Sequence, residues 1–337
     1  MKRLICAILV TVLMLGTVMP VFASAPVRYV SSDKFEYTLE NGEATIVCWA
    51  GDFKTVSKMD VFTFPGTVDG YPVKAIGNSA FYVDEDLDPH YDEALYTNLF
   101  YNKKIVLSEG IEKIGDYAFS SCNMFYSTLV LPSTLTDIGT DAFYNTCLAS
   151  VQFGEGLKNI GDGAFLDCKL TNVVLPDSVE TIGDSAFAEN KSIESVAFSE
   201  NLSYIGFGAF SDNNIKSVTL PEKLKYLGPY AFSTNCDLNS ITADCPEIEL
   251  VGYNIVYNTA YYKNESNWEN GVLYVGDIAF MPLNTAEVQI RNGTKVIAQT
   301  YVDTTDRTYF SMVIKNLVLP STIKRICKNA LRNMPGL

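Results

Sequence analysis

The residues best suited to chemistry gather in one segment, which holds the only histidine of the 337-residue sequence. His90 lies between Tyr82 and Lys104 together with six acidic residues, Asp84, Glu85, Asp86, Asp88, Asp92 and Glu93. Such a segment could form a calcium or transition-metal loop. Its acidic residues do not follow the ligand order of an EF-hand, however, and one histidine is a poor basis for a metal site. We therefore expect a solvated acidic loop and no metal site.

Catalysis has little support in the sequence. A single histidine leaves few ways to build a Ser-His-Asp or Cys-His arrangement, and the nucleophile motif G-x-S-x-G does not occur. A carbohydrate hydrolase needs only a pair of carboxylates, but no pair stands out from the other acidic residues. The sequence thus predicts a protein that is not an enzyme and uses no cofactor, with a carbohydrate hydrolase as the least favoured alternative.

Cysteines recur at a fixed position after a repeated six-residue motif, I-G-x-x-A-F. Three residues beyond the motif phenylalanine stand Cys122, Thr146, Cys168, Asn190, Asn213 and Asn235. The exchange of cysteine with asparagine predicts a buried ladder of small polar groups that satisfy backbone groups. Disulfides between neighbouring repeats are the alternative. No C-x-x-C occurs, which argues against a redox enzyme.

Aspartates recur directly after the Ile-Gly pair of the same motif. They are Asp116, Asp162 and Asp184. A row of carboxylates could bind calcium, but aspartate is also a preferred N-cap residue, whose carboxylate accepts a backbone N–H bond at the start of a helix. We favour the N-cap interpretation.

The motif itself repeats with a period near 22 residues. Its first residue stands at positions 76, 114, 138, 160, 182, 205 and 227, in steps of 38, 24, 22, 22, 23 and 22 residues. This period is typical of a leucine-rich-repeat solenoid, in which no single unit can close its own core. We therefore predict an α/β solenoid with coils of about 22 residues, a parallel β-sheet on one face and short helices on the other.

Each unit has a strand half and a turn half. In the unit at residues 170–190, Val173 and Leu175 alternate with Asn172 and Val174, so the first pair is expected to face the core. The corresponding inward pairs are Val151 with Phe153, Val196 with Phe198, and Val218 with Leu220. The glycine of Ile-Gly is expected either at a positive φ or where two coils approach closely.

The repeat, L-x-x-V-x-L-P-x-x-L-x-x-I-G-x-x-A-F, resembles the BspA-like leucine-rich repeat family of bacterial and protist cell-surface proteins. The resemblance covers most of the chain from about Phe35 onward, and residues 35–47 look like the lead-in hairpin of that family. Independently, Asn41-Gly42 between two alternating runs is a strong hairpin signal. We expect this β-hairpin to form an N-terminal cap on the solenoid. The resemblance implies a role in adhesion to a host or matrix.

The chain divides into five expected segments. Residues 1–25 read as a secretory signal peptide, because two cations precede an apolar run and small residues follow it. Residues 26–58 are assigned to the capping hairpin and 59–246 to leucine-rich repeats. Residues 247–286 form an insertion with a hairpin signal, and residues 287–337 hold further repeats. We expect the last segment to be truncated, because the sequence stops where a strand should begin.

The insertion is rich in aromatic residues, which are Tyr253, Tyr257, Tyr261, Tyr262 and Trp268. Aromatic side chains are enriched at interfaces, but they also pack insertions onto the structures that carry them. We favour packing onto the side of the solenoid.

Charge and the leader sequence limit the classes of partner. The net charge of −14 repels nucleic acid and anionic lipid surfaces, and no segment after the leader is apolar enough to span a membrane. A secreted or cell-surface protein, expected to be a monomer, that binds an extracellular protein or glycan is the first hypothesis. The alternative is a structural spacer that displays another domain of a longer protein.

The expected binding residues lie on the outward side of the strands, where they form a small and neutral surface. They are Thr128, Val130, Ser150, Gln152, Asn172, Val174, Ser195, Ser217 and Thr219. A featureless sheet with the binding site elsewhere is the alternative interpretation of these positions.

Overall fold

The computed structural model describes residues 26–51, 58–82, 100–124, 126–280, 286–299 and 314–331. The expected signal peptide, the loop that contains His90, and the last six residues lie outside these ranges.

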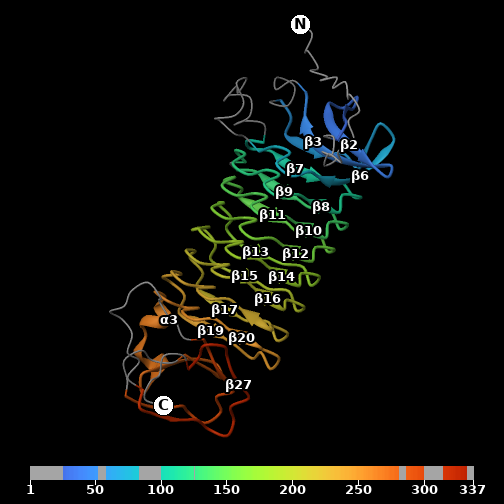
Figure 1. Ribbon diagram of the computed structural model, residues 1–337. Helices are drawn as coiled ribbons and strands as arrows, with labels where there is room; N and C mark the ends of the chain where they lie inside the picture. Colours follow the sequence, from blue (N-terminus) through green and yellow to red (C-terminus); the bar gives the residue numbers. More distant parts are fainter. Residues whose placement is uncertain are drawn as a thin grey trace, which may run out of the picture.

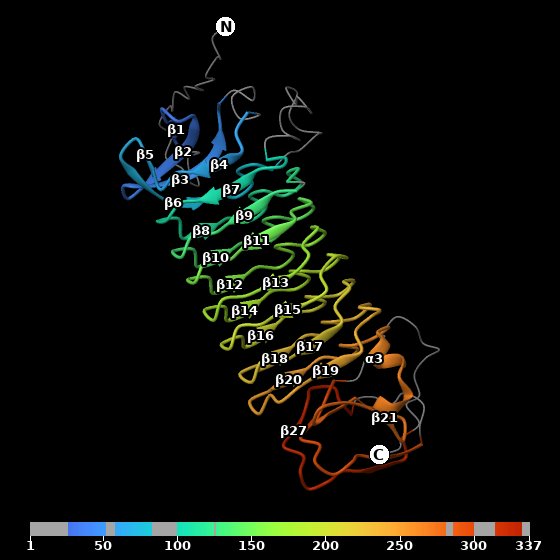
Figure 2. The same cartoon turned by 180° about the vertical axis from the view of Figure 1, so that it is seen from behind.

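The chain winds into a solenoid in which most coils contribute two strands, so that two parallel ladders run side by side along the molecule (Figures 1 and 2). The first ladder contains β4 (Val61–Phe64), β7 (Lys104–Leu107), β9 (Thr128–Val130), β11 (Ser150–Gln152), β13 (Val173–Val174), β15 (Val196–Ala197), β17 (Ser217–Thr219) and β19 (Ser240–Thr242). The second contains β6 (Tyr71–Ile76), β8 (Lys113–Ile114), β10 (Asp137–Ile138), β12 (Asn159–Ile160), β14 (Thr181–Ile182), β16 (Tyr204–Ile205), β18 (Tyr226–Leu227) and β20 (Leu250–Val251). The second ladder, formed by the residues around each motif isoleucine, was not expected from the sequence.

The N-terminal strands form an antiparallel unit at one end of the solenoid (Figure 1). β1 (Arg28–Val30) pairs with β2 (Phe35–Glu40), and β2 pairs with β3 (Glu43–Trp49). The turn between β2 and β3 holds Asn41 at a φ of 53° and Gly42 at 82°, the left-handed pair that suits a two-residue hairpin. β3 pairs in parallel with β6, and β5 (Thr67–Val68) pairs with β6 in the antiparallel direction.

The second ladder continues past residue 246, because β20 pairs in parallel with β18. After β20 come α3 (Ala260–Lys263) and η1 (Glu265–Asn267), which are the helices of the described residues, and neither is long and apolar enough to cross a membrane. An antiparallel meander follows, made of β21 (Trp268–Glu269), β22 (Val272–Val275) and β23 (Ile278–Phe280). The hairpin predicted from Asn270-Gly271 is therefore present inside the expected insertion.

Parallel pairing resumes after the meander. β23 pairs with β25 (Val296–Ile297), which pairs with β27 (Arg325–Ile326). β24 (Glu287–Gln289) pairs with β26 (Asn316–Val318). These strands lie at the C-terminal end of the solenoid, below β20 in Figure 1.

The short helices expected on the other face are not formed in the described coils, where the segments after each Ile-Gly pair fold as turns. The reason is that each turn contains two residues in the left-handed region, which a right-handed helix excludes. One follows the motif glycine by two positions, as in Tyr117 at a φ of 57° and Ser185 at 55°. The other follows the motif phenylalanine by two positions, as in Asn145 at 53° and Glu189 at 60°.

Glycine is required in the motif because neighbouring coils approach closely there, and not because its φ is positive. A Cβ atom at Gly183 would lie 2.5 Å from the backbone nitrogen of Asp162 in the preceding coil, a distance that real Cβ atoms do not reach. The glycine therefore allows the backbones of neighbouring coils to touch, which was one of the two expectations.

The core holds a ladder of phenylalanine rings, one from each motif. Phe119, Phe143, Phe165, Phe187, Phe210 and Phe232 are all fully buried. Centroids of successive rings lie 5.1 to 5.6 Å apart, and the ring planes are within 11° of parallel. Each ring thus fills space against the coil before and the coil after, which a single coil cannot provide.

The predicted polar ladder is confirmed next to these rings. The Nδ2 atom of Asn190 donates hydrogen bonds to the carbonyl oxygens of Phe165 and Phe187, at 2.7 and 3.2 Å. In the same slot, the Sγ atom of Cys168 lies 3.2 Å from the carbonyl oxygen of Phe143 and takes the role of the amide. The thiol of Cys168 is free, and its burial raises its pKa to about 11. The alternative of a disulfide at this position is wrong.

We predict that Phe187→Ala lowers the free energy of unfolding by about 3–5 kcal/mol, because it leaves a cavity between two coils. Chemical denaturation measures this change. Phe207→Ala is the control, since Phe207 lies in the next coil but its side chain is 43% exposed, and its loss should have a much smaller effect. Equal effects of the two substitutions would contradict the ring ladder.

A second pair of variants separates close approach from backbone conformation. Gly183→Ala should destabilise the protein by about 1–3 kcal/mol, because the new Cβ overlaps the preceding coil. Ser185→Gly, two residues away, should change stability by less than about 1 kcal/mol or raise it, because glycine adopts a positive φ without strain. Thermal unfolding of both variants checks the order, and a tolerated Gly183→Ala would overturn the role given to the glycine.

Candidate functional site

The candidate site is the outward side of the first ladder, from β4 to β19, which we call the strand face. Parallel pairing aligns Thr128 with Ser150, and Val130 with Gln152. The structure places all nine expected binding residues on this face: Thr128, Val130 and Ser150 are half-buried, while Gln152, Asn172, Val174, Ser195, Ser217 and Thr219 are exposed.

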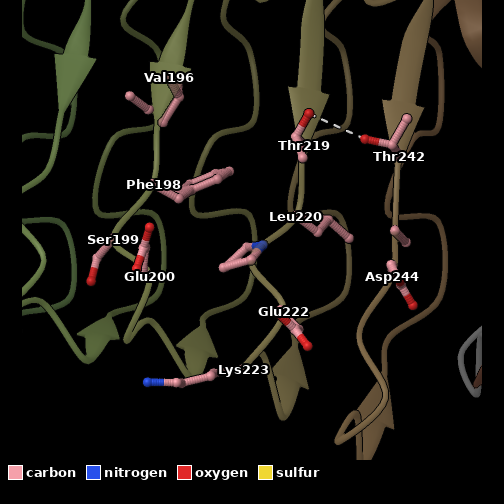
Figure 3. A pocket seen from close by; sticks show the side chains of 13 residues that line it. Val196, Phe198, Ser199, Glu200, Thr219, Leu220, Glu222, Lys223, Thr242 and Asp244 are labelled. Carbon is pink, nitrogen blue, oxygen red and sulfur yellow. Dashed lines mark hydrogen bonds between the residues drawn. The ribbon is translucent and has the colours of Figure 1, made fainter.

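Hydroxyl groups on the strand face bond to one another across neighbouring strands. The Oγ atoms of Thr128 and Ser150 lie 2.8 Å apart. The Oγ1 atom of Thr242 donates to that of Thr219 at 3.1 Å, as Figure 3 shows. These pairs link β9 to β11 and β17 to β19, while Gln152, Asn172 and Ser195 are exposed to solvent.

The strand face is interrupted twice, because the first ladder is three separate sheets: β4–β7–β9–β11, β13–β15 and β17–β19. A groove lies at each interruption. The first groove, between β11 and β13, has a volume of about 440 Å³ and is lined by Gln152, Phe153, Asn172 and Val174 among others. The second groove, between β15 and β17, has a volume of about 670 Å³ (Figure 3). Some of the expected binding residues therefore line a groove, and the others lie on the strands outside the grooves.

The grooves coincide with two phenylalanines that replace leucine. At the same register of the strand, Leu131, Leu175 and Leu220 are buried, but Phe153 and Phe198 are half-buried and line the grooves. The Phe198 ring contacts Phe210 of its own coil, with centroids 5.5 Å apart, and Phe232 of the next coil, at 6.3 Å. Figure 3 shows this ring between the strands that carry Val196 and Thr219.

The Phe153 ring has the same two contacts, with Phe165 of its own coil at 5.8 Å and with Phe187 of the next coil at 6.5 Å. A phenylalanine at this register thus spans two coils on the strand side of the core. At Phe153 and Phe198 the ring is half-buried and the pairing of the first ladder stops, whereas the ring of Phe64, at the same register, is fully buried and its strand β4 pairs with β7. The expectation that Phe153 and Phe198 face the core is therefore only partly right, since each ring also forms the floor of a groove.

The sequence contains a signal for this arrangement in the two residues that end each strand half. After the buried strand residue, successive coils read Leu131-Pro, Phe153-Gly, Leu175-Pro, Phe198-Ser and Leu220-Pro. Phenylalanine without proline occurs in every second coil, and each time the ladder is broken after that coil. The two grooves are therefore two coils apart.

Carboxylates border both grooves just beyond the ends of the strands. Glu155 and Asp177 line the first groove, and Glu200, Glu222 and Asp244 line the second. Among the described residues, the salt bridges involve none of these five carboxylates. Lys223 also lines the second groove, but its Nζ atom donates to Asn201 at 2.6 Å. The grooves are thus apolar at the floor and acidic at one end.

The aspartates that follow Ile-Gly accept backbone hydrogen bonds, as expected, but from the next coil and not from a helix. The Oδ1 atom of Asp162 accepts from the nitrogen of Asp184 at 2.8 Å, and that of Asp184 accepts from the nitrogen of Phe207 at 2.7 Å. Within the described ranges, no group of three or more His, Cys, Asp or Glu side chains is placed to hold a metal ion. These carboxylates therefore join coils.

Three of the five aromatic residues of the expected insertion pack against the solenoid. Tyr261, Tyr262 and Trp268 are partly buried against the core. The hydroxyl of Tyr261 donates to the carbonyl oxygen of Tyr274 at 2.7 Å, and the Trp268 indole donates to that of Tyr262 at 2.8 Å. These three side chains have a structural role, which agrees with the interpretation favoured from the sequence.

Comparison with known proteins places the chain in a family. The family model described as "BspA type Leucine rich repeat region" matches six copies, over residues 90–168, 112–239 and 158–287, which together span more than half of the sequence. No curated protein matches the chain.

Two solved structures share the fold. A leucine rich cell surface protein of Faecalibacterium prausnitzii A2-165 is 22% identical, with a TM-score of 0.57 over 93% of this chain and 76% of its own. A leucine-rich repeat protein of Bacteroides ovatus ATCC 8483 is 20% identical, with a TM-score of 0.54 over 90% of this chain and 80% of its own. The repeat motif, the stacked coils and the family match agree, and the chain belongs to the BspA-type leucine-rich repeat family.

Proposed function

We propose that this protein is a secreted or cell-surface binding module that presents its strand face to an extracellular protein or glycan. Membership of a leucine-rich repeat family supports a binding role, and one structural relative is described as a cell surface protein. The observation that carries the proposal is the composition of the face. From β9 to β17 its outward residues are uncharged and small, although the chain as a whole has a net charge of −14.

A surface of this kind suits recognition for two physical reasons. Uncharged hydroxyl and amide groups can bond to a ligand without the large desolvation penalty of a charge. The parallel strands that carry them are each paired with at least one neighbour, so little conformational entropy is lost when a ligand binds. The proposed role is binding without catalysis.

The test is binding to an array of glycans and extracellular matrix proteins. A face variant carries Asn172→Glu, Ser195→Glu and Ser217→Glu, three exposed positions of the strand face. Any ligand found with the unchanged protein should bind this variant about tenfold more weakly or worse, because carboxylates buried in the interface would be unpaired. Circular dichroism should show an unchanged fold.

A matched control adds the same charge elsewhere. Ser121→Glu, Asn145→Glu and Thr234→Glu all fall in the turn position where the natural sequence already has Glu189. This control should bind as the unchanged protein does. If the face variant binds equally well, the ligand site lies off the strand face; if no ligand binds at all, the chain acts as a spacer that displays another domain.

A further inference from the structure

The two grooves are equivalent and repeat along the solenoid axis. Phe153 and Phe198 occupy the same position two coils apart, and so do the groove-wall residues Val174 and Thr219. Over the same coils the strands of the second ladder, β12, β14 and β16, are paired without a break, and paired strands lie 4.7–4.9 Å apart, so two coils advance by about 10 Å along the axis. A ligand that follows the axis therefore meets two similar grooves about 10 Å apart.

This spacing matches one regular peptide conformation. A polyproline II helix has three residues per turn and rises 3.1 Å per residue, so residues i and i+3 lie on one side about 9.3 Å apart. An extended β-strand returns to the same side every two residues, after about 6.7 Å, which does not match. An α-helix repeats one side after seven residues, about 10.5 Å, but its intermediate apolar residues would rest on the polar ridge of Asn172 and Ser195.

The floor of each groove suits proline side chains. Phe153 lies beside Leu175 and Pro176 in the first groove, and Phe198 lies beside Leu220 and Pro221 in the second. Aromatic-lined grooves are the usual docking sites of proline-rich segments, which already have the bound conformation and so lose little entropy. The grooves have this chemistry, with a half-buried ring in each.

The carboxylates at the ends of the grooves favour positive charge at the ligand positions next to the docked prolines. Glu155 and Asp177 border the first groove, and Glu200 and Glu222 border the second, without a salt bridge in the described structure. A lysine or arginine placed next to each docked proline would face these carboxylates. The complementary ligand is therefore basic, which also agrees with the net charge of −14 of the chain.

We propose that the two grooves bind a basic, proline-rich segment of a partner protein in the polyproline II conformation, with prolines three residues apart in the two grooves and basic residues toward the carboxylates. This inference rests on the proposed function, because it names the class of ligand for the same strand face. It selects a peptide over a glycan.

The probe is a synthetic peptide of four Pro-Arg-Ala triplets, with binding measured by calorimetry. Two control peptides test spacing and charge separately. The spacing control contains three repeats of Pro-Arg-Ala-Ala, and the charge control contains four repeats of Pro-Gln-Ala. The first peptide should bind, and each control should bind about tenfold more weakly or worse, because one control cannot place prolines in both grooves and the other cannot pair with the carboxylates. Equal binding of either control would overturn the proposal.

Two protein variants locate the peptide. Phe198→Leu with Ser199→Pro gives this coil the Leu-Pro pair of its neighbours, which should close the second groove, keep the fold and lower peptide affinity about tenfold or more. Glu200→Gln with Glu222→Gln should weaken binding and reduce its salt dependence. Glu189→Gln with Glu265→Gln, two exposed carboxylates away from the grooves, is the matched control and should bind the peptide normally.

The outcomes separate this inference from the proposed function. Loss of peptide binding in both groove variants, with thermal stability retained, supports the inference. Unchanged peptide binding in the groove-closing variant overturns it. If the peptide does not bind while the face variant still loses an array ligand, glycan or protein, the peptide inference is wrong and the strand face remains the binding surface.

Discussion

The structure depends on contact between one coil and the next. No coil of about 22 residues can enclose its own apolar side chains, so each motif phenylalanine is buried against the rings before and after it, with centroids little more than 5 Å apart. The glycine of each Ile-Gly pair lets the backbones meet, since even a Cβ atom at Gly183 would overlap the preceding coil. Asn190 and Cys168 complete the contact, because their side chains bond to carbonyl groups that the turns leave available.

The same constraint applies beside the two grooves. Because the core has one fixed spacing per coil, a ring placed on the strand side must share its space with the next coil. Phe153 and Phe198 do so, and the pairing of the first ladder stops at those two places while the second ladder continues without a break. A half-buried phenylalanine in place of leucine thus coincides with each of the two apolar grooves.

Much of the fold could be predicted from the sequence, because its determinants are local and repeated. The period, the buried phenylalanines, the hairpin at Asn41-Gly42 and the polar slot at Asn190 all follow from residue type and spacing. The turns could not, because left-handed residues such as Tyr117 and Ser185 are not glycine and give no signal of their conformation. The grooves could not be predicted, because phenylalanine at this register can be fully buried, as Phe64 is, or half-buried, as Phe153 and Phe198 are.

The interruption of the first ladder beside Phe153 and Phe198 is tested most directly by hydrogen exchange of single backbone amides. The amides of Val174 and Thr219 are those that would continue the ladder across the two grooves, whereas the amides of Val130 and Ala197 lie within paired strands. The account predicts fast exchange at Val174 and Thr219 and strong protection at Val130 and Ala197. Equal protection at all four amides would show that the ladder is continuous and would contradict the account.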